Sequence, residues 1–228
     1  MHPFVTFFRR WRYLLLLAAL LLLLVIQPIV SGFGAAGWLF DVLLVFVMLT
    51  MVLALARDEV WRVIALFLCV PAAALSMGSH LLTSSAQEVS LTAGHVIGAL
   101  FFILVTVRII QSIFESHSLS LDSIFGAICG YLLLGVAWGL TYAMIHAANS
   151  ESFQFHNSIR GEIEQGNSNS HVFIYYSFVT LTTVGYGDIT PVSTPARTLA
   201  WVEALTGQLY LAVLIAGLIS ALVASKKN

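Results

Sequence analysis

The sequence predicts an all-α membrane protein with six transmembrane helices and one short, re-entrant helix before the last of them. Of its 228 residues, 59% are hydrophobic and 9% are charged, whereas soluble domains carry about 25% charged residues. Six runs are apolar over about the 20 residues that a helix needs to cross a bilayer core of about 30 Å. A seventh run, 171–183, is too short to cross it, which predicts the re-entrant helix.

The six long runs follow one another closely and leave little chain for anything else. They cover residues 13–30, 38–56, 60–82, 91–114, 123–147 and 198–224. The polar linker 115–122 divides the chain into two parts, 1–118 with four helices and 119–228 with the other two and the short run. Residues 149–170 are rich in Ser, Asn and Gly, and this composition predicts a solvated loop.

The basic residues predict the orientation of the first run and therefore of those that follow. Arg9, Arg10 and Arg12 precede it, and the connection 34–37 after it carries no charge. The positive-inside rule then places the N-terminus in the cytoplasm. With six spans the C-terminus is cytoplasmic too, as expected for a multi-pass protein of the cell membrane. A cleaved signal peptide is the alternative interpretation of the first run; it would leave five spans with the last connection on the same side.

Little in the sequence indicates an enzyme. Cys69 and Cys129 both lie within apolar runs, where cysteines are usually small core residues. We find no His, Cys, Asp and Glu cluster with metal-ligand spacing, no nucleophile motif and no phosphate-binding glycine loop. We therefore predict neither catalysis nor a cofactor. The net charge of −1 points to no particular partner, and we expect no nucleic acid.

The connection before the last run contains a specific motif. It reads Thr183, Val184, Gly185, Tyr186 and Gly187, and Asp188 follows it. Backbone carbonyls along such a strand can all point toward one axis if the two glycines take a positive φ, which a side chain would obstruct. Irregular backbone at membrane depth needs a wall of protein or water. The residues 171–182, with four aromatic side chains, are predicted to supply that wall.

This motif resembles the selectivity filter of the potassium channel family, of the six-transmembrane, single-pore, bacterial-like type. The resemblance covers about residues 120–225. It implies potassium ions bound by the carbonyls of Thr183, Val184, Gly185 and Tyr186, with the Thr183 hydroxyl adding the innermost site and Gly187 completing the filter. One copy of the motif supplies one wall of four, so the resemblance also implies a homotetramer.

The resemblance further implies residues that support the filter. Tyr175 stands where family members often have a Trp that hydrogen-bonds the Asp after the filter, which implies a pair between Tyr175 and Asp188. Glu203 is ionisable and lies early in the last run, so it is a second candidate for support. It could pair with Arg197 or with polar groups of the short run. The alternative is an interfacial carboxylate that water still reaches.

Glycines in the last two runs have two interpretations. Gly207 matches the glycine at which the inner helix of the family bends during gating, but glycine is equally common where helices pack closely in lipid. Both interpretations stay open. In the fifth run, two pairs of glycines four residues apart predict close contact with a neighbouring helix: Gly126 with Gly130, and Gly135 with Gly139.

The four-helix part resembles a voltage sensor in architecture only. A sensor helix needs several arginines at every third position, because each elementary charge contributes about 2.3 kcal/mol per 100 mV. The fourth run has one basic residue, Arg108, near its cytoplasmic end, so we predict little voltage dependence. Asp41, Asp58 and Glu59 could act as countercharges of a sensor, but their places near helix ends favour solvated carboxylates.

The sequence therefore predicts a subunit that conducts potassium passively through a tetrameric pore in membrane lipid. The alternatives are a non-conducting or regulatory channel-like subunit and a weakly selective cation channel. The intact pair Gly185 and Gly187 argues against both. No nucleotide-binding or calcium-sensing cytoplasmic domain is expected, so control by a ligand would act through lipid, through the outer loop or through a separate regulatory protein.

Overall fold

The computed structural model describes residues 3–26, 36–55, 58–79, 81–82, 85–114, 121–157, 159 and 170–225. The described part is mostly helical, in agreement with the predicted class. Its helical elements are α1 (Pro3–Leu21), the π-helical turn η1 (Leu22–Ile26), α3 (Ala36–Ala54), α4 (Glu59–Ser79), α5 (Ser85–Phe114), α6 (Leu121–Ala148), the short 3-10 turn η2 (Ser150–Ser152), α8 (Ser170–Leu181) and α9 (Thr194–Ser225). Two short strands, β1 (Phe153–Phe155) and β2 (Ile189–Pro191), form an antiparallel ribbon in which Phe155 lies opposite Ile189.

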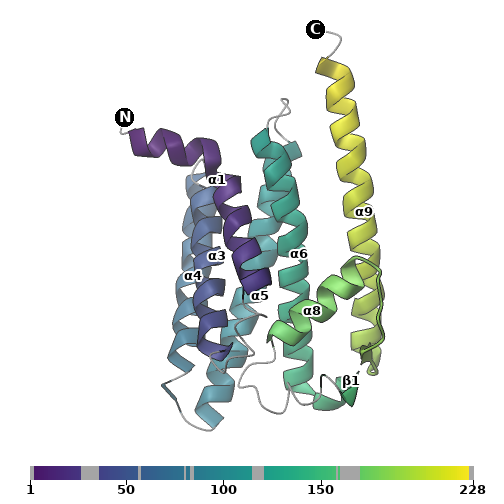
Figure 1. Ribbon diagram of the computed structural model, residues 1–228. Coiled ribbons are helices and arrows are strands. Elements are labelled where there is room, and N and C mark those ends of the chain that lie inside the picture. The colour runs from purple at the N-terminus through teal and green to yellow at the C-terminus, as the bar shows by residue number, and fades with distance from the viewer. Residues whose placement is uncertain are drawn as a thin grey trace.

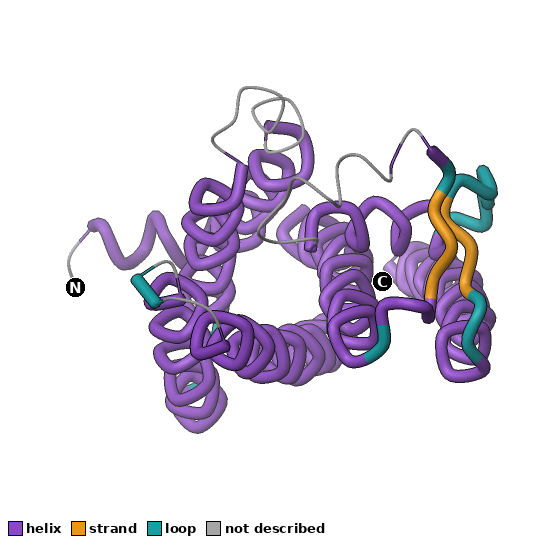
Figure 2. Tube along the Cα trace, turned by 90° about the horizontal axis from the view of Figure 1, so that it is seen from below, coloured by secondary structure: helices purple, strands orange, loops and turns teal. Residues whose placement is uncertain are grey.

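The helices stand roughly side by side, and α8 crosses between two of them (Figure 1). Helix α9 is separated from α6 over much of its length, and the start of α1 lies at the same end of the array as the end of α9. Figure 2, which looks along the helices, shows the ribbon on the side away from the N-terminus. The connection that holds the glycine motif joins the end of α8 to β2.

Four helices of the described part are long and apolar enough to cross a membrane. They are Glu59–Ser79, Thr92–Ser112, Asp122–Ala148 and Thr194–Gly217. The first two predicted runs appear as shorter apolar helical segments, Arg12–Ile26 and Leu39–Ala54. These helices support a multi-pass membrane protein.

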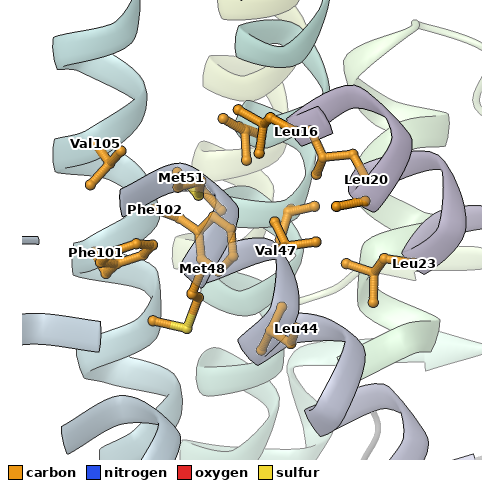
Figure 3. Packing of buried hydrophobic residues seen from close by; sticks show 14 of the residues in the cluster. Leu16, Leu20, Leu23, Leu44, Val47, Met48, Met51, Phe101, Phe102 and Val105 are labelled. Atoms are coloured by element: carbon orange, nitrogen blue, oxygen red, sulfur yellow. The ribbon is translucent and has the colours of Figure 1, made fainter. Parts of the chain in front are cut away.

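Helices α1, α3 and α5 meet in a core of aliphatic, aromatic and sulfur-containing side chains (Figure 3). Apolar residues recur every three or four positions on each helix, so that they form one stripe that faces the neighbours. The labelled residues that are almost fully buried are Leu16, Leu20, Leu23, Val47, Met48, Met51, Phe101, Phe102 and Val105. Residues of α6, among them Cys129 and Leu133, belong to the same core. The two parts of the chain that the sequence separates are therefore packed directly against each other.

Of the three carboxylates predicted to be solvated, one is buried and another is half-buried and paired with an arginine. The Arg108 guanidinium forms an ion pair with Asp58, with the Nη2 and Nε atoms 2.9 Å and 3.0 Å from Oδ2. Asp41 is buried, with 1% of its surface exposed, whereas Glu59 is exposed as predicted. The prediction failed because a position near a helix end does not reveal which neighbouring helix covers it.

The start of the predicted solvated loop is also ordered. Phe153 of β1 is buried and packs its ring against Tyr142 of α6 and against Phe173 and Tyr176 of α8, with ring centroids 5.0–5.8 Å apart. Ser, Asn and Gln are close to Phe153 in the sequence, so the composition of this segment does not reveal a buried aromatic residue. The rest of that loop, 160–169, and most of the linker, 115–120, lie outside the described residues.

Candidate functional site

Helix α8 is short and is held by two glycines of α6. Its 12 residues extend about 18 Å, well short of a bilayer core. A Cβ atom at Gly139 would lie 2.6 Å from the Ile174 Cα, and one at Gly135 would lie 2.6 Å from the Phe178 ring. Real Cβ atoms do not approach so closely, so only glycine allows α8 to lie directly on α6. The predicted close contact at this glycine pair is confirmed.

Gly207 of α9 is the matching contact on the other side of α8. A Cβ atom there would collide with the backbone carbonyl oxygen of Leu181, and it would lie 3.0 Å from the Leu181 Cδ1. Leu181 is the last residue of α8, so this contact fixes the point at which the motif begins. The geometry accounts for Gly207 by packing, and bending at Gly207 remains a prediction.

The end of α8 turns the chain sharply into the motif. The Thr183 N–H donates to the Thr180 carbonyl (2.9 Å), and the Val184 N–H donates to the Val179 carbonyl (2.9 Å). This pair of bonds is the Schellman arrangement, in which the residue after the helix takes a left-handed conformation. That residue is Thr183, with φ 60°. A β-branched residue rarely adopts such an angle, and conformations of this kind cost of order 1–3 kcal/mol and cluster at functional sites.

The motif continues with an alternating backbone. Like Thr183, Gly185 and Gly187 have a positive φ, of 58° and 78°, whereas the residues that alternate with these three, Val184 and Tyr186, do not. When left- and right-handed residues alternate, successive peptide groups turn the same way, so that like groups gather on one edge of the strand. Apart from the adjacent residues, no atom of the described part of the chain lies within 4 Å of a Cβ built on either glycine. Glycine is therefore required here by the backbone angle and not by packing within the chain.

The carbonyls of this strand have no partner within the described part of the chain. None of the hydrogen bonds found there ends on a carbonyl of residues 183–187. The side chains of Val184 and Tyr186 are also exposed, by 51% and 71%. Unpaired carbonyls at membrane depth are costly unless water, protein or an ion meets them. The strand is thus a row of open oxygen ligands.

The far end of the strand is anchored through Asp188. The Tyr175 hydroxyl donates to Asp188 Oδ2 (2.5 Å), the Ile189 N–H donates to Oδ1 (3.0 Å), and the His156 N–H donates to the Asp188 carbonyl (2.8 Å). The structure therefore brings Tyr175 and Asp188 together. Burial, together with the Asp188 carboxylate, raises the pKa of Tyr175 to about 12, so this hydroxyl keeps its proton through the neutral range.

The ribbon β1–β2 closes the anchorage immediately after Asp188. Beyond the paired strands, the Val192 N–H donates to the Ser152 carbonyl (2.8 Å), and Phe153 seats β1 against α6 and α8. Residues 183–188 are thus fixed at one end by α8 and at the other by this ribbon. The ribbon could not be predicted from the sequence, because a three-residue strand carries no periodic signal of its own.

Glu203 of α9 lies behind α8 and is fully buried. Its Oε2 accepts a hydrogen bond from the Tyr142 hydroxyl (2.7 Å), and its Oε1 lies 2.5 Å from the Ser177 Oγ. The sequence offered two kinds of partner for Glu203: Arg197 or polar groups of the short helix. The structure shows a polar group of α8, Ser177, whereas the Arg197 Nε donates to the Pro191 carbonyl (3.2 Å). The alternative of an interfacial carboxylate reached by water is wrong. Ser177 and Tyr142 could not be identified from sequence, because neither stands in a motif.

Helix α9 presents a large apolar surface that the described part of the chain does not cover. Only 11% of its candidate span is buried. The exposed large side chains lie on more than one side of the helix and include Trp201, Leu205, Leu209, Leu211, Val213 and Ile215. An apolar helix that stands outside its own bundle is expected to contact lipid or further protein chains.

The site as a whole offers a row of backbone oxygen ligands. Among the described residues there is no group of three His, Cys, Asp or Glu side chains that could hold a metal ion. Backbone carbonyls suit hard cations that bind oxygen and exchange readily. A single strand can meet such a cation from one side only.

Comparison with known proteins points to the same segment. A family whose description is "Ion channel" matches residues 127–224, which include α8, the strand 183–188 and nearly all of α9. Protein LctB of Bacillus caldotenax is 34% identical to this chain over 100 residues, which make up 44% of this chain and 72% of that protein. No solved structure matches the chain.

Proposed function

Because this chain belongs to the ion channel family, we propose that it is a subunit of a potassium-selective channel that conducts the ion passively down its gradient. One observation carries the proposal: residues 183–187 form an exposed strand with alternating φ and with open carbonyls. In this proposal the strand is the selectivity filter.

A potassium ion sheds its water in the filter and receives carbonyl oxygens instead. The ligands in our proposal are the carbonyls of Thr183, Val184, Gly185 and Tyr186, with the Thr183 hydroxyl at the inner end. The positive φ of Gly185 and Gly187 keeps these carbonyls on one edge. The negative end of the α8 helix dipole, at its C-terminus, modestly stabilises a cation located on the inner side of the filter.

The proposed assembly is a homotetramer in lipid. Four strands related by a rotation axis surround the ion, and such closed symmetry is usual for membrane and soluble oligomers alike. The exposed apolar surface of α9 supports this arrangement, because four copies of α9 would line the inner pore and cover part of one another. Lipid would contact what remains.

The proposed topology has six spans and α8 as the re-entrant pore helix. It counts Arg12–Ile26 and Leu39–Ala54 as spans although they are shorter than the other four. The start of α1 and the end of α9 lie at one end of the helix array (Figure 1), as an even number of spans requires. The basic residues that precede the first span place this end in the cytoplasm.

Conductance is expected to depend little on voltage. Arg108, the one arginine or lysine of α5, is neutralised by Asp58 at a distance of 2.9 Å. A single paired charge that crossed the whole field would contribute only about 2.3 kcal/mol per 100 mV. Single-channel recording between positive and negative voltages should find nearly constant open probability. A steep rise over a few tens of millivolts would contradict this prediction.

The Tyr175→Phe variant is expected to weaken selectivity without preventing assembly. It removes a hydrogen bond to the Asp188 carboxylate from a side chain that is 40% exposed, so the loss should be about 1 kcal/mol per subunit. The ratio of potassium to sodium flux should fall several-fold while the tetramer remains intact. Tyr13→Phe, which removes a hydroxyl contact with Ser112 far from the filter, is the matched control. A Tyr175→Phe ratio equal to that of the control would argue against the role of this pair.

Flux measurements in liposomes test the proposal as a whole. The purified full-length chain is reconstituted, and the decay of a potassium gradient is compared with that of an equal sodium gradient. We expect potassium to pass far faster than sodium. Equal rates would indicate a weakly selective cation channel, and absence of both fluxes from correctly assembled protein would indicate a non-conducting subunit.

A further inference from the structure

Buried side-chain and backbone oxygens meet where α6, α8 and α9 pack together. If Glu203 is ionised, these oxygens make more short contacts than there are hydrogens to place between them. Three short oxygen–oxygen contacts meet there. The Tyr142 hydroxyl lies 2.7 Å from Glu203 Oε2, the Ser177 Oγ lies 2.5 Å from Glu203 Oε1, and the same Oγ lies 2.8 Å from the Gly135 carbonyl oxygen. Each such contact needs one hydrogen between its oxygens.

Counting hydrogens separates the two protonation states. Tyr142 and Ser177 contribute one hydroxyl hydrogen each, and the Gly135 carbonyl contributes none. If Glu203 is ionised, two hydrogens must serve three contacts, and one pair of oxygens faces each other without a hydrogen. If Glu203 carries a proton, all three contacts are satisfied. Glu203 then donates to Ser177, Ser177 donates to the Gly135 carbonyl, and Tyr142 donates to Glu203.

The surroundings also disfavour a charge. Glu203, Ser177 and Tyr142 are all fully buried, and a buried carboxylate without a cation is far costlier than the neutral acid. The titratable groups that face Glu203 are tyrosines: Tyr142 and Tyr131 from α6, and Tyr176 from α8. Arg197, on α9 itself, is exposed and bonded to the Pro191 carbonyl. No cation in the described part of the chain contacts Glu203.

We propose that Glu203 is held as the neutral carboxylic acid and that its proton completes a hydrogen-bonded link from α9 through Ser177 of α8 to the Gly135 carbonyl of α6. Glu203 is thus a positioning residue, because it acts on the filter only through α8. The link joins the two helices that flank α8 and fixes the rotation of α8 about its axis. This inference goes beyond the proposed function, since it does not depend on which ion crosses the pore.

Infrared spectroscopy of the full-length chain in vesicles of neutral lipid tests the proton directly. At neutral pH the wild type should show a carboxylic-acid C=O stretching band that the Glu203→Gln variant lacks. The control is Glu151→Gln, which removes an exposed carboxylate of η2 and should leave that band in place. A Glu203→Gln spectrum that instead loses a carboxylate band would overturn the proposal, as would one with no difference from the wild type.

Thermal unfolding at several pH values gives an independent reading. A Glu203 that is neutral when folded and ionised when unfolded releases a proton on unfolding, so stability falls as pH rises above the ordinary range of a glutamate. Between about pH 5 and pH 7, the unfolding equilibrium constant of the wild type should rise about tenfold per pH unit per subunit relative to Glu203→Gln. The Glu151→Gln variant should follow the wild type. Parallel pH dependences of wild type and Glu203→Gln would contradict the proposal.

Discussion

The Gly185→Ala variant is expected to abolish potassium flux. Gly185 has a φ of 58°, and an L-residue in the left-handed region costs about 1–2 kcal/mol. All four subunits of the proposed tetramer would bear this cost at one level of the pore. Because no other described residue lies within 4 Å of the added Cβ, the strain comes from the backbone angle, and residues 183–187 can relieve it only by leaving the alternating conformation. Its carbonyls would then turn away from the ion, and liposome flux should fall to the background of empty vesicles.

Gly78→Ala is the matched control for this variant. Gly78 lies in α4, also with no atom within 4 Å of a built Cβ, but without a positive φ. Alanine should stabilise the helix there by up to about 1 kcal/mol and leave flux unchanged. The two variants differ in backbone angle and not in available space. A Gly185→Ala channel that conducts potassium as well as Gly78→Ala would refute the role assigned to this glycine.

The Gly207→Ala variant is expected to lower both stability and flux. The added methyl group meets the Leu181 carbonyl, which is part of the backbone and cannot move aside as a flexible side chain can. Overpacking of this kind costs about 1–3 kcal/mol per site. The end of α8 would be pushed away from α9, and Thr183 would move with it. The thermal midpoint of the tetramer and the potassium flux should therefore fall together.

A joint fall in thermal midpoint and potassium flux would show that Gly207 is needed for packing and not only as a gating hinge. If Gly207 served only as a hinge, alanine would stiffen α9 and reduce flux while the thermal midpoint stayed at or above that of the wild type. Gly98→Ala in α5 is the control, because the nearest atom to its built Cβ is 4.0 Å away. This variant should change neither quantity. Reduced flux at an undiminished thermal midpoint in Gly207→Ala would favour the hinge.

The helices and the backbone angles of the two motif glycines could be predicted because their causes are local. An apolar run of sufficient length specifies a membrane helix without reference to any neighbour, and all seven predicted runs overlap observed helical segments. Gly185 and Gly187 are likewise needed for a local reason, because the backbone at these two positions has a positive φ. The motif predicts Thr183 as an ion ligand. It does not predict the left-handed conformation of Thr183, because that conformation depends on how α8 ends.

The contacts of the residues around the proposed filter could not be predicted because their causes are tertiary. Nothing in the sequence near Ser177 indicates that it faces Glu203, and nothing near Phe153 indicates that it packs on α8. The pair of Arg108 and Asp58 was missed for the same reason, since 50 residues separate its members. Pairings between distant helices follow from the packing of α6, α8 and α9, which the periodicity of a single run does not determine.

A structure of the assembled full-length protein in thallium, which replaces potassium and can be located by its anomalous scattering, would show the ion and its ligands directly. We expect four chains around one axis, with thallium sites on that axis ringed by the carbonyls of residues 183–186. An assembly without fourfold symmetry, or thallium absent from an axis that residues 183–187 surround, would refute the proposed filter.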